Sequence, residues 1–237
     1  MAVTKEERRE LLSLYEGLRV ADVRDGMDTL LLHATGSMSP DVRPLWRTRV
    51  HGIARTVRYL PYAGTVPRLA SDEYWQWVSR YYKEVCPYPW IKQIEEGDIW
   101  VIDQSGVNAG LMGSENTLSC LRAGARGLVS NGGVRDTDEI ILQKVPFWSV
   151  FVSQSMVQAR LQYDATDVPV TVGGVTVNTG DVVVADGDGV IVVPLKVARE
   201  AAQHAHAEHR RDMKRRREHY RALGREPDQT VAAPDAK

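Results

Sequence analysis

The segment Gly127-Leu-Val-Ser-Asn-Gly-Gly-Val-Arg-Asp136 decides how this sequence is interpreted. Its apolar part, 128–131, is typical of a buried strand, and a helix is predicted directly after it, over 137–144. Between them stands Gly132-Gly133, where the absence of side chains lets the backbone turn or approach a ligand closely. The segment therefore predicts a strand, a glycine turn and a helix start, which is a common anion-binding junction.

Arg135 and Asp136 are the polar side chains at this junction. The Arg135 guanidinium can bind a carboxylate through two parallel hydrogen bonds, and the Asp136 carboxylate is a hard oxygen ligand suited to Mg²⁺ or Mn²⁺. The alternative needs no ligand: Asp136 followed by Glu139 has the spacing of a helix cap with its capping-box partner.

The remaining sequence predicts alternating helices and strands. Hydrophobic periodicity predicts helices over 4–19, 20–31, 114–125 and 195–223, and strands over 50–60, 99–102, 145–152, 170–172, 175–177, 182–184 and 190–193. Residues 104–113 are expected to form a loop. We expect one α/β domain over 1–224 and a disordered tail over 225–237, where periodicity is absent.

The overall composition excludes several classes of function. The 237 residues carry a formal net charge of -1, so no general attraction to nucleic acid or membranes is expected. Neither an apolar N-terminal segment nor a run of roughly 18 apolar residues occurs, which predicts a cytoplasmic protein. The two cysteines, Cys86 and Cys120, form no metal or disulfide motif. Hydrolase, NTPase and dinucleotide-binding motifs are missing, and no histidine motif for a metal is present.

Four other segments have competing interpretations. Loop 108–114 precedes a helix and could bind an anion, or Ser114 could only cap that helix. The sequence Asp186-Gly-Asp-Gly189 lacks the spacing of a calcium loop and is expected to be a turn. The basic run 214–217 lies on a helix among Glu208, Asp212 and Glu218 and is expected on a solvated helix face, in preference to a nucleic-acid site. Aromatic residues over 74–90 have helical spacing, which favours packing on the core or another subunit over a substrate lid.

The order of these motifs resembles the RraA-like family. That family includes the 4-hydroxy-4-methyl-2-oxoglutarate/4-carboxy-4-hydroxy-2-oxoadipate aldolases and the regulator of ribonuclease E activity. The resemblance extends from about Val20 to Leu223. It rests on motifs that follow one another in the family's order: 21–28, 52–56, Gly97-Asp98, the Gly113 loop, 127–136, Pro146-Phe147, 173–177, Gly180-Asp181 and 186–194.

The resemblance implies a fold, a reaction and a set of site residues. The fold is an α/β sandwich of the swivelling ββα type with a long C-terminal helix, assembled as a homotrimer or homohexamer. The reaction is a divalent-metal-dependent cleavage of a small 2-oxo acid, by an aldolase or an oxaloacetate-type decarboxylase, through an enolate. The implied roles are Asp136 for Mg²⁺ or Mn²⁺, Arg135 for the substrate and its polarisation, and loop amides for the substrate carboxylate. The amides belong to the segment 110–116, in particular Gly113, Ser114, Glu115 and Asn116.

One position departs from the aldolase pattern. The active aldolases have an acidic residue, then twenty residues, then Arg-Asp, and the acidic position corresponds here to Ser114. Glu115 is displaced by one residue, which on a helix turns the side chain by roughly 100°. Glu115 is still the candidate for proton transfer in this sequence. Another lyase or a hydratase on the same scaffold is therefore an alternative, and so is a non-catalytic regulator that binds a protein partner.

The resemblance also implies an acidic residue supplied by the C-terminal helix of a neighbouring subunit. Glu208 or Asp212 could take that role in this chain. The alternative is that both are surface charges of a solvated helix. The aromatic segment 70–92 also looks longer than is usual in the family, and we expect it to enlarge or cover the pocket.

Overall fold

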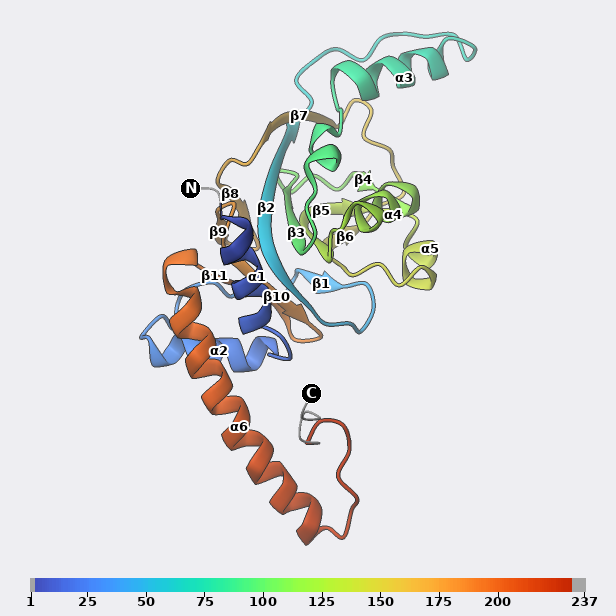
Figure 1. Cartoon of the computed structure of the whole chain (residues 1–237). Helices are drawn as coiled ribbons and strands as arrows, with labels where there is room; N and C mark the ends of the chain where they lie inside the picture. The colour runs from blue at the N-terminus through green and yellow to red at the C-terminus, as the bar shows by residue number, and fades with distance from the viewer. Residues whose placement is uncertain (1–2, 232–237) are drawn as a thin grey trace.

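Strand β2 (Val50–Pro61) organises the sheet, because three other strands pair along its length (Figure 1). It runs parallel to β3 (Asp98–Asp103) and antiparallel to β10 (Val182–Asp186) and β7 (Leu161–Thr166). The computed structural model describes residues 3–231. In it, nine strands curl into one strongly bent, nearly closed sheet.

The other strands extend this sheet on both sides of β2. They are β1 (Arg43–Pro44), β4 (Gly110–Met112), β5 (Gly127–Val134), β6 (Phe147–Val152) and β11 (Gly189–Val193), and a separate hairpin consists of β8 (Val170–Val172) and β9 (Val175–Val177). The order is β1-β6-β5-β3-β2-β10-β11, with β4 paired to β5. Because β3, β5 and β6 are parallel, their carboxyl ends lie at the same edge.

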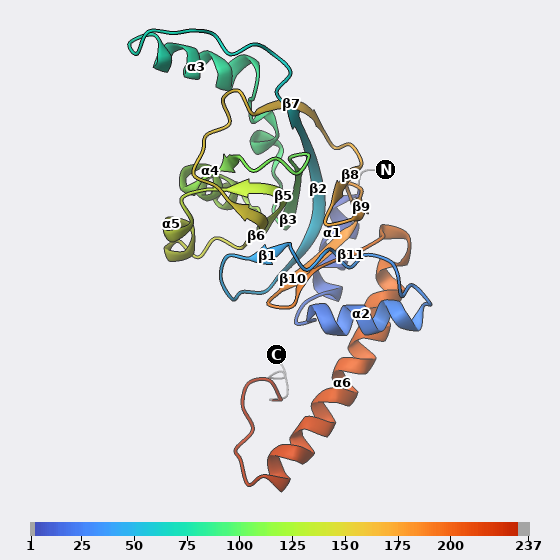
Figure 2. The same cartoon turned by 180° about the vertical axis from the view of Figure 1, so that it is seen from behind.

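Helices cover both outer sides of the sheet. They are α1 (Lys5–Leu14), α2 (Val20–Thr29), α3 (Tyr74–Glu84), α4 (Ser114–Ala123), α5 (Thr137–Leu142) and α6 (Ala198–Ala222), with short 3-10 helices η1 (Pro89–Gln93) and η2 (Leu195–Val197). Figures 1 and 2 show α1, α2 and α6 on the β10–β11 side and α4 and α5 on the β5–β6 side. Helix α3 and the end of α6 project from the body in different directions.

Strand β3 shows how the sheet separates two apolar cores. All six of its residues are buried. Ile99 and Val101 pack with Trp148 inside the curved sheet, whereas Trp100 and Ile102 pack on the side of α4 and η1. This alternation follows from the twofold repeat of a strand, and burial on both faces is typical of parallel strands covered by helices.

The expected α/β fold with a long C-terminal helix is confirmed. The strands expected over 170–172, 175–177, 182–184 and 190–193 are also present, and they pair as two hairpins. The turn between β10 and β11 contains Gly187 and Asp188, and the Asp188 amide donates to the Asp186 carboxylate at 2.9 Å. The expected loop 104–113 is partly wrong, because it contains β4. Strand β7 was not predicted, since Leu161–Thr166 is only partly buried and has mixed polarity.

The predicted glycine turn at Gly132-Gly133 is also wrong, because β5 continues through both glycines to Val134. A Cβ on Gly132 would lie 2.4 Å from Cδ of Gln104, so glycine is required here by close packing within the sheet. Pairing with β6 is irregular between Ser130 and Gly133. Strand β5 is therefore longer than the sequence predicts, and only Arg135 and Asp136 lie between it and α5.

The end of the chain turns back beside α6 over the part that the structure describes. The Tyr220 hydroxyl donates a hydrogen bond to Asp228 at 2.7 Å, and the Val231 carbonyl accepts one from Arg217. Residues 232–237, the rest of the segment predicted to be disordered, lie outside the described residues. Over residues 3–231, no helix has the length and apolar composition needed to cross a membrane.

Candidate functional site

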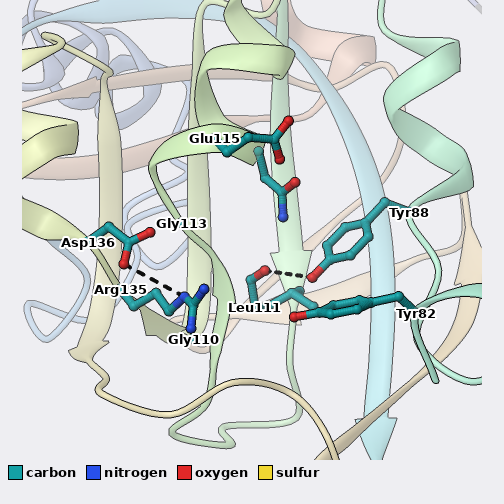
Figure 3. Close-up of a pocket in the computed structure, with 9 residues that line it drawn as sticks. Tyr82, Tyr88, Gly110, Leu111, Gly113, Glu115, Arg135 and Asp136 are labelled. Atoms are coloured by element: carbon teal, nitrogen blue, oxygen red, sulfur yellow. Dashed lines mark hydrogen bonds and ion pairs between the residues drawn. The ribbon is translucent and has the colours of Figure 1, made fainter. Parts of the chain in front are cut away.

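A cavity of about 370 Å³ lies beyond the carboxyl end of β5 (Figure 3). Its lining comes from three parts of the chain: Tyr82 and Tyr88, the segment 110–116, and Arg135 with Asp136. The open edge beyond parallel strands is a usual place for ligand binding in α/β proteins. The sequence-predicted residues Gly113, Glu115, Asn116, Arg135 and Asp136 all line this one cavity.

The end of β5 fixes the direction of Arg135 and Asp136. The Arg135 amide donates to the Met112 carbonyl at 3.0 Å, which holds β4 against this point. Asp136 has the left-handed backbone conformation, with φ 56° and ψ 41°. Its Oδ1 lies 3.7 Å from Nε of Arg135, so the cation and the carboxylate share one wall of the cavity (Figure 3).

The Asp136 carboxylate contacts the start of α4 and does not cap its own helix. Its Oδ2 accepts hydrogen bonds from the Ser114 amide at 3.1 Å and the Ser114 hydroxyl at 3.3 Å. Helix α5 has no side-chain cap at Asp136, so the capping-box alternative for Asp136 and Glu139 is wrong. Ser114 is not the N-cap of α4 either, because it is the first helical residue and Gly113 takes the N-cap position. The two junctions predicted separately are therefore one site.

Gly113 allows the two junctions to meet. A Cβ at this position would lie 2.5 Å from Oδ2 of Asp136 and 3.4 Å from Cγ of Arg135. A carbon atom cannot lie 2.5 Å from a carboxylate oxygen without a clash. A larger residue at position 113 would therefore displace Asp136 from the start of α4. The glycine is therefore needed for this close approach.

The first turn of α4 forms one end of the same cavity. An α-helix leaves its first amide groups without partners inside the helix and has positive partial charge there. The Ser114 amide binds Asp136, while Glu115 and Asn116, which carry the next two amides, line the cavity. This end of the cavity can bind a carboxylate group.

Two tyrosines complete the wall opposite Arg135, and both belong to the aromatic segment 70–92 that was expected to enlarge or cover the pocket. The Tyr88 hydroxyl donates to the Leu111 carbonyl at 2.8 Å, and the Tyr82 and Tyr88 rings lie 6.1 Å apart. Burial holds the pKa of Tyr88 well above its ordinary value of 10.0, so the phenol stays protonated and donates. Tyr81 faces the core, and Tyr82 is the next residue along the helix. This position is the sequence signal that could have singled out Tyr82.

The predicted acids on α6 are not part of this cavity within one chain. Asp212 forms ion pairs with Arg19 at 3.1 Å and Arg216 at 3.4 Å, and Glu208 pairs with Arg211. Helix α6 lies on the other side of the sheet from α4 (Figure 1).

The described residues fit a divalent cation bound through few protein ligands. Among residues 3–231, no three His, Cys, Asp or Glu side chains gather into a metal-binding group. Mg²⁺ commonly retains several waters and uses one or two carboxylates together with oxygen atoms of the substrate. Asp136 offers such a carboxylate within the cavity, and Arg135 and the α4 amides could hold an anionic ligand beside it.

Comparison with known proteins supports one family assignment. The family model RraA-like (Aldolase/RraA) matches residues 20–192. Protein DlpA of Legionella pneumophila is 26% identical over 178 residues, which are 73% of this chain and 26% of that protein. A putative 4-hydroxy-4-methyl-2-oxoglutarate aldolase of Deinococcus radiodurans is 34% identical over 98 residues, 41% of this chain and 61% of that protein. The matches thus span less than two thirds of these relatives.

Solved structures share the fold over most of the chain. An uncharacterized protein from Pseudomonas syringae pv. tomato has a TM-score of 0.72 at 26% identity, covering 98% of this chain and all of that one. Streptomyces coelicolor RraAS2, an unusual member of the RNase ES inhibitor RraA protein family, has a TM-score of 0.71 at 27% identity, covering 88% of this chain and 98% of that one. The chain belongs to the RraA-like family.

Proposed function

We propose that this protein is a lyase that cleaves a carbon–carbon bond in a small 2-oxo acid with the help of Mg²⁺ or Mn²⁺. The observation that supports this most is the meeting of Arg135, Asp136 and the first turn of α4 around one cavity. The names of the putative aldolases among the relatives agree with a 2-oxo acid substrate.

Each group has a separate task in this proposal. Arg135 binds the 2-oxo acid and neutralises the negative charge that develops on the 2-oxo oxygen as the bond breaks. The Glu115 and Asn116 amides orient the substrate carboxylate. Asp136 would hold the divalent cation, which would act as a Lewis acid towards the 2-oxo acid.

The reaction needs no redox cofactor. In aldol cleavage, the C4 hydroxyl loses its proton and becomes a carbonyl, the C3–C4 electron pair moves onto C3 as an enolate, and C3 then takes up a proton. In the decarboxylation of oxaloacetate, CO₂ leaves in place of the carbonyl fragment and the same enolate forms. Glu115 is the group we propose for proton transfer, because it is the second carboxylate of the cavity lining.

The test measures pyruvate release from oxaloacetate and from a panel of 4-hydroxy-2-oxo acids, with Mg²⁺, with Mn²⁺ and with EDTA. We expect metal-dependent release by the wild type and a loss of at least about a hundredfold in Asp136→Asn and Arg135→Lys. The matched controls are Asp138→Asn and Arg9→Lys, exposed residues outside the cavity. No turnover of any substrate, together with no metal binding, would remove the lyase proposal. It would leave the protein-binding regulator, by analogy with the RNase inhibitor relatives.

We also propose a homotrimer or homohexamer, the assembly that the family resemblance implies. Helix α6 projects beyond the body of the chain, so Glu208 or Asp212 could reach the cavity of a second copy (Figure 2). Light scattering after size exclusion gives the assembly. Glu208→Gln and Asp212→Asn, assayed separately, test which acid contributes to turnover.

A further inference from the structure

The charges around the cavity limit the kind of 2-oxo acid that fits. Within the described chain, its lining holds one cationic side chain, Arg135, and two carboxylates, Glu115 and Asp136. If Arg135 and the α4 amides take the 2-oxo acid head, no second cation of the lining remains for another carboxylate. A second carboxylate would instead share the cavity with Glu115, and like charges at close range disfavour binding.

The wall away from Arg135 is aromatic and apolar. Its exposed part consists of Tyr82 and Tyr88, because Leu111 is only 1% exposed. Figure 3 shows both tyrosine side chains entering the cavity from the side opposite Asp136. The two rings are tilted by 31° with centroids 6.1 Å apart, so they lie next to each other on this wall. An aromatic or branched apolar group gains both area burial and ring contacts on such a surface.

This wall is held in place by hydrogen bonds to the body of the fold. The Tyr81 hydroxyl donates to the Leu161 carbonyl at 2.7 Å, which fixes the end of α3 next to Tyr82. The Tyr163 amide donates to the Val85 carbonyl at 2.8 Å, just beyond the helix. Because Tyr88 is also bonded to Leu111, the position of its ring is set before a ligand binds, and the backbone that carries Tyr82 is anchored beside it.

We propose that the site selects 4-hydroxy-2-oxo monocarboxylic acids with an aromatic or apolar substituent on C4, in preference to di- and tricarboxylates. This inference rests on the lyase function proposed above. For a C4 phenyl substrate, cleavage of the C3–C4 bond gives pyruvate and benzaldehyde. The proton of the C4 hydroxyl leaves that oxygen and one proton is added to C3, so the reaction balances without a further reactant.

The test compares two substrates with the same reacting head, 4-hydroxy-2-oxo-4-phenylbutanoate and 4-hydroxy-4-methyl-2-oxoglutarate. Pyruvate release is measured for both under identical metal concentrations. We expect the phenyl substrate to have the higher kcat/KM. In Tyr82→Ala we expect its kcat/KM to fall about three- to tenfold, the range of one aromatic contact, with little change for the dicarboxylate.

Two further variants make the result specific. Trp75→Ala removes another aromatic residue of α3, one that is 66% exposed and outside the cavity lining, and should leave both substrates unchanged. Tyr82→Arg adds a cation to the wall and should shift preference towards the dicarboxylate. If the wild type prefers the dicarboxylate, the inference is wrong and the lyase function stands. If neither substrate, nor oxaloacetate, releases pyruvate, the lyase function and this inference both fail.

Discussion

At the scale of single residues, the backbone of Asp136 explains why this carboxylate belongs to a site. A left-handed conformation in a residue other than glycine costs on the order of 1–3 kcal/mol, although Asp tolerates it better than most. That conformation turns the side chain away from α5 and towards the Ser114 amide and hydroxyl. The hydrogen bonds at the start of α4 offset the conformational cost and keep the carboxylate beside Arg135.

Ser114→Asp should restore the acid that the aldolases have at this position. Because Oγ of Ser114 lies 3.3 Å from Oδ2 of Asp136, the new carboxylate would lie beside the existing one. Two carboxylates repel each other without a cation and bind one more tightly together. We expect Mn²⁺ affinity, measured by titration calorimetry, to rise by about tenfold or more. Ser114→Asn is the neutral control, and equal affinity in both variants would contradict this geometry.

At the scale of elements, the contact between α2 and α6 joins the start of the chain to its long C-terminal helix. Gly26 lies where the helices meet, and a Cβ there would be 2.5 Å from the Ala201 carbonyl oxygen and 2.8 Å from the Ala205 amide nitrogen. Small residues thus bring the two backbones together. Ala201, Ala202 and Ala205 are fully buried on the facing side.

Gly26→Ala should therefore destabilise the fold, although alanine is the better helix former. The gain in helix propensity is about 1 kcal/mol, while overpacking against a rigid backbone costs about 1–3 kcal/mol. We expect a net loss of up to about 2 kcal/mol in the free energy of unfolding, measured with urea. Asp25→Ala, an exposed change on the same helix, should cause no such loss. A Gly26→Ala protein more stable than the wild type would show that the helices can separate.

The elements also show how far sequence reasoning reaches. Periodicity located the strand and the helix around Arg135-Asp136, whereas the family resemblance joined these two residues with Gly113, Glu115 and Asn116, and all five line one cavity. Periodicity could not distinguish a turn from a strand at Gly132-Gly133, since the packing of Gln104 against Gly132 is a long-range contact. Sequence reasoning placed the aromatic segment 70–92 at the pocket but could not single out Tyr82 and Tyr88, because their positions depend on the anchoring of Tyr81 to β7 and of Tyr88 to Leu111.

At the scale of the whole molecule, His51 connects three distant parts of the chain. It lies on β2, and its Nε2 is 2.8 Å from the Leu12 carbonyl of α1 and 2.8 Å from the Arg126 guanidinium before β5. Burial, together with the positive charge of Arg126, lowers the pKa of His51 below 6.5. The folded protein therefore keeps this imidazole neutral in a range of pH where the unfolded chain protonates it.

This difference gives the stability a defined pH dependence. The contribution of the neutral His51 is fully present above pH 6.5 and is lost as the pH falls towards its lowered pKa, because the unfolded state then binds more protons. The slope from one such group is at most about 1.4 kcal/mol per pH unit. Urea unfolding at several values between about pH 7.5 and 5.5 should show a smaller decrease in His51→Gln than in the wild type. If the free energy of unfolding falls equally with pH in both proteins, His51 is not the source of the pH dependence.

The central claim is that Arg135, Asp136 and the start of α4 form one site for a metal-bound 2-oxo acid. Oxalate has the planar shape and charge of the pyruvate enolate, so its binding tests this site without depending on the choice of substrate. The most direct measurement is calorimetric titration of oxalate with and without Mg²⁺. We predict binding by the wild type only when Mg²⁺ is present, and its loss in Asp136→Asn but not in Asp138→Asn. Oxalate binding that is independent of Mg²⁺ and unchanged in Asp136→Asn would contradict the claim.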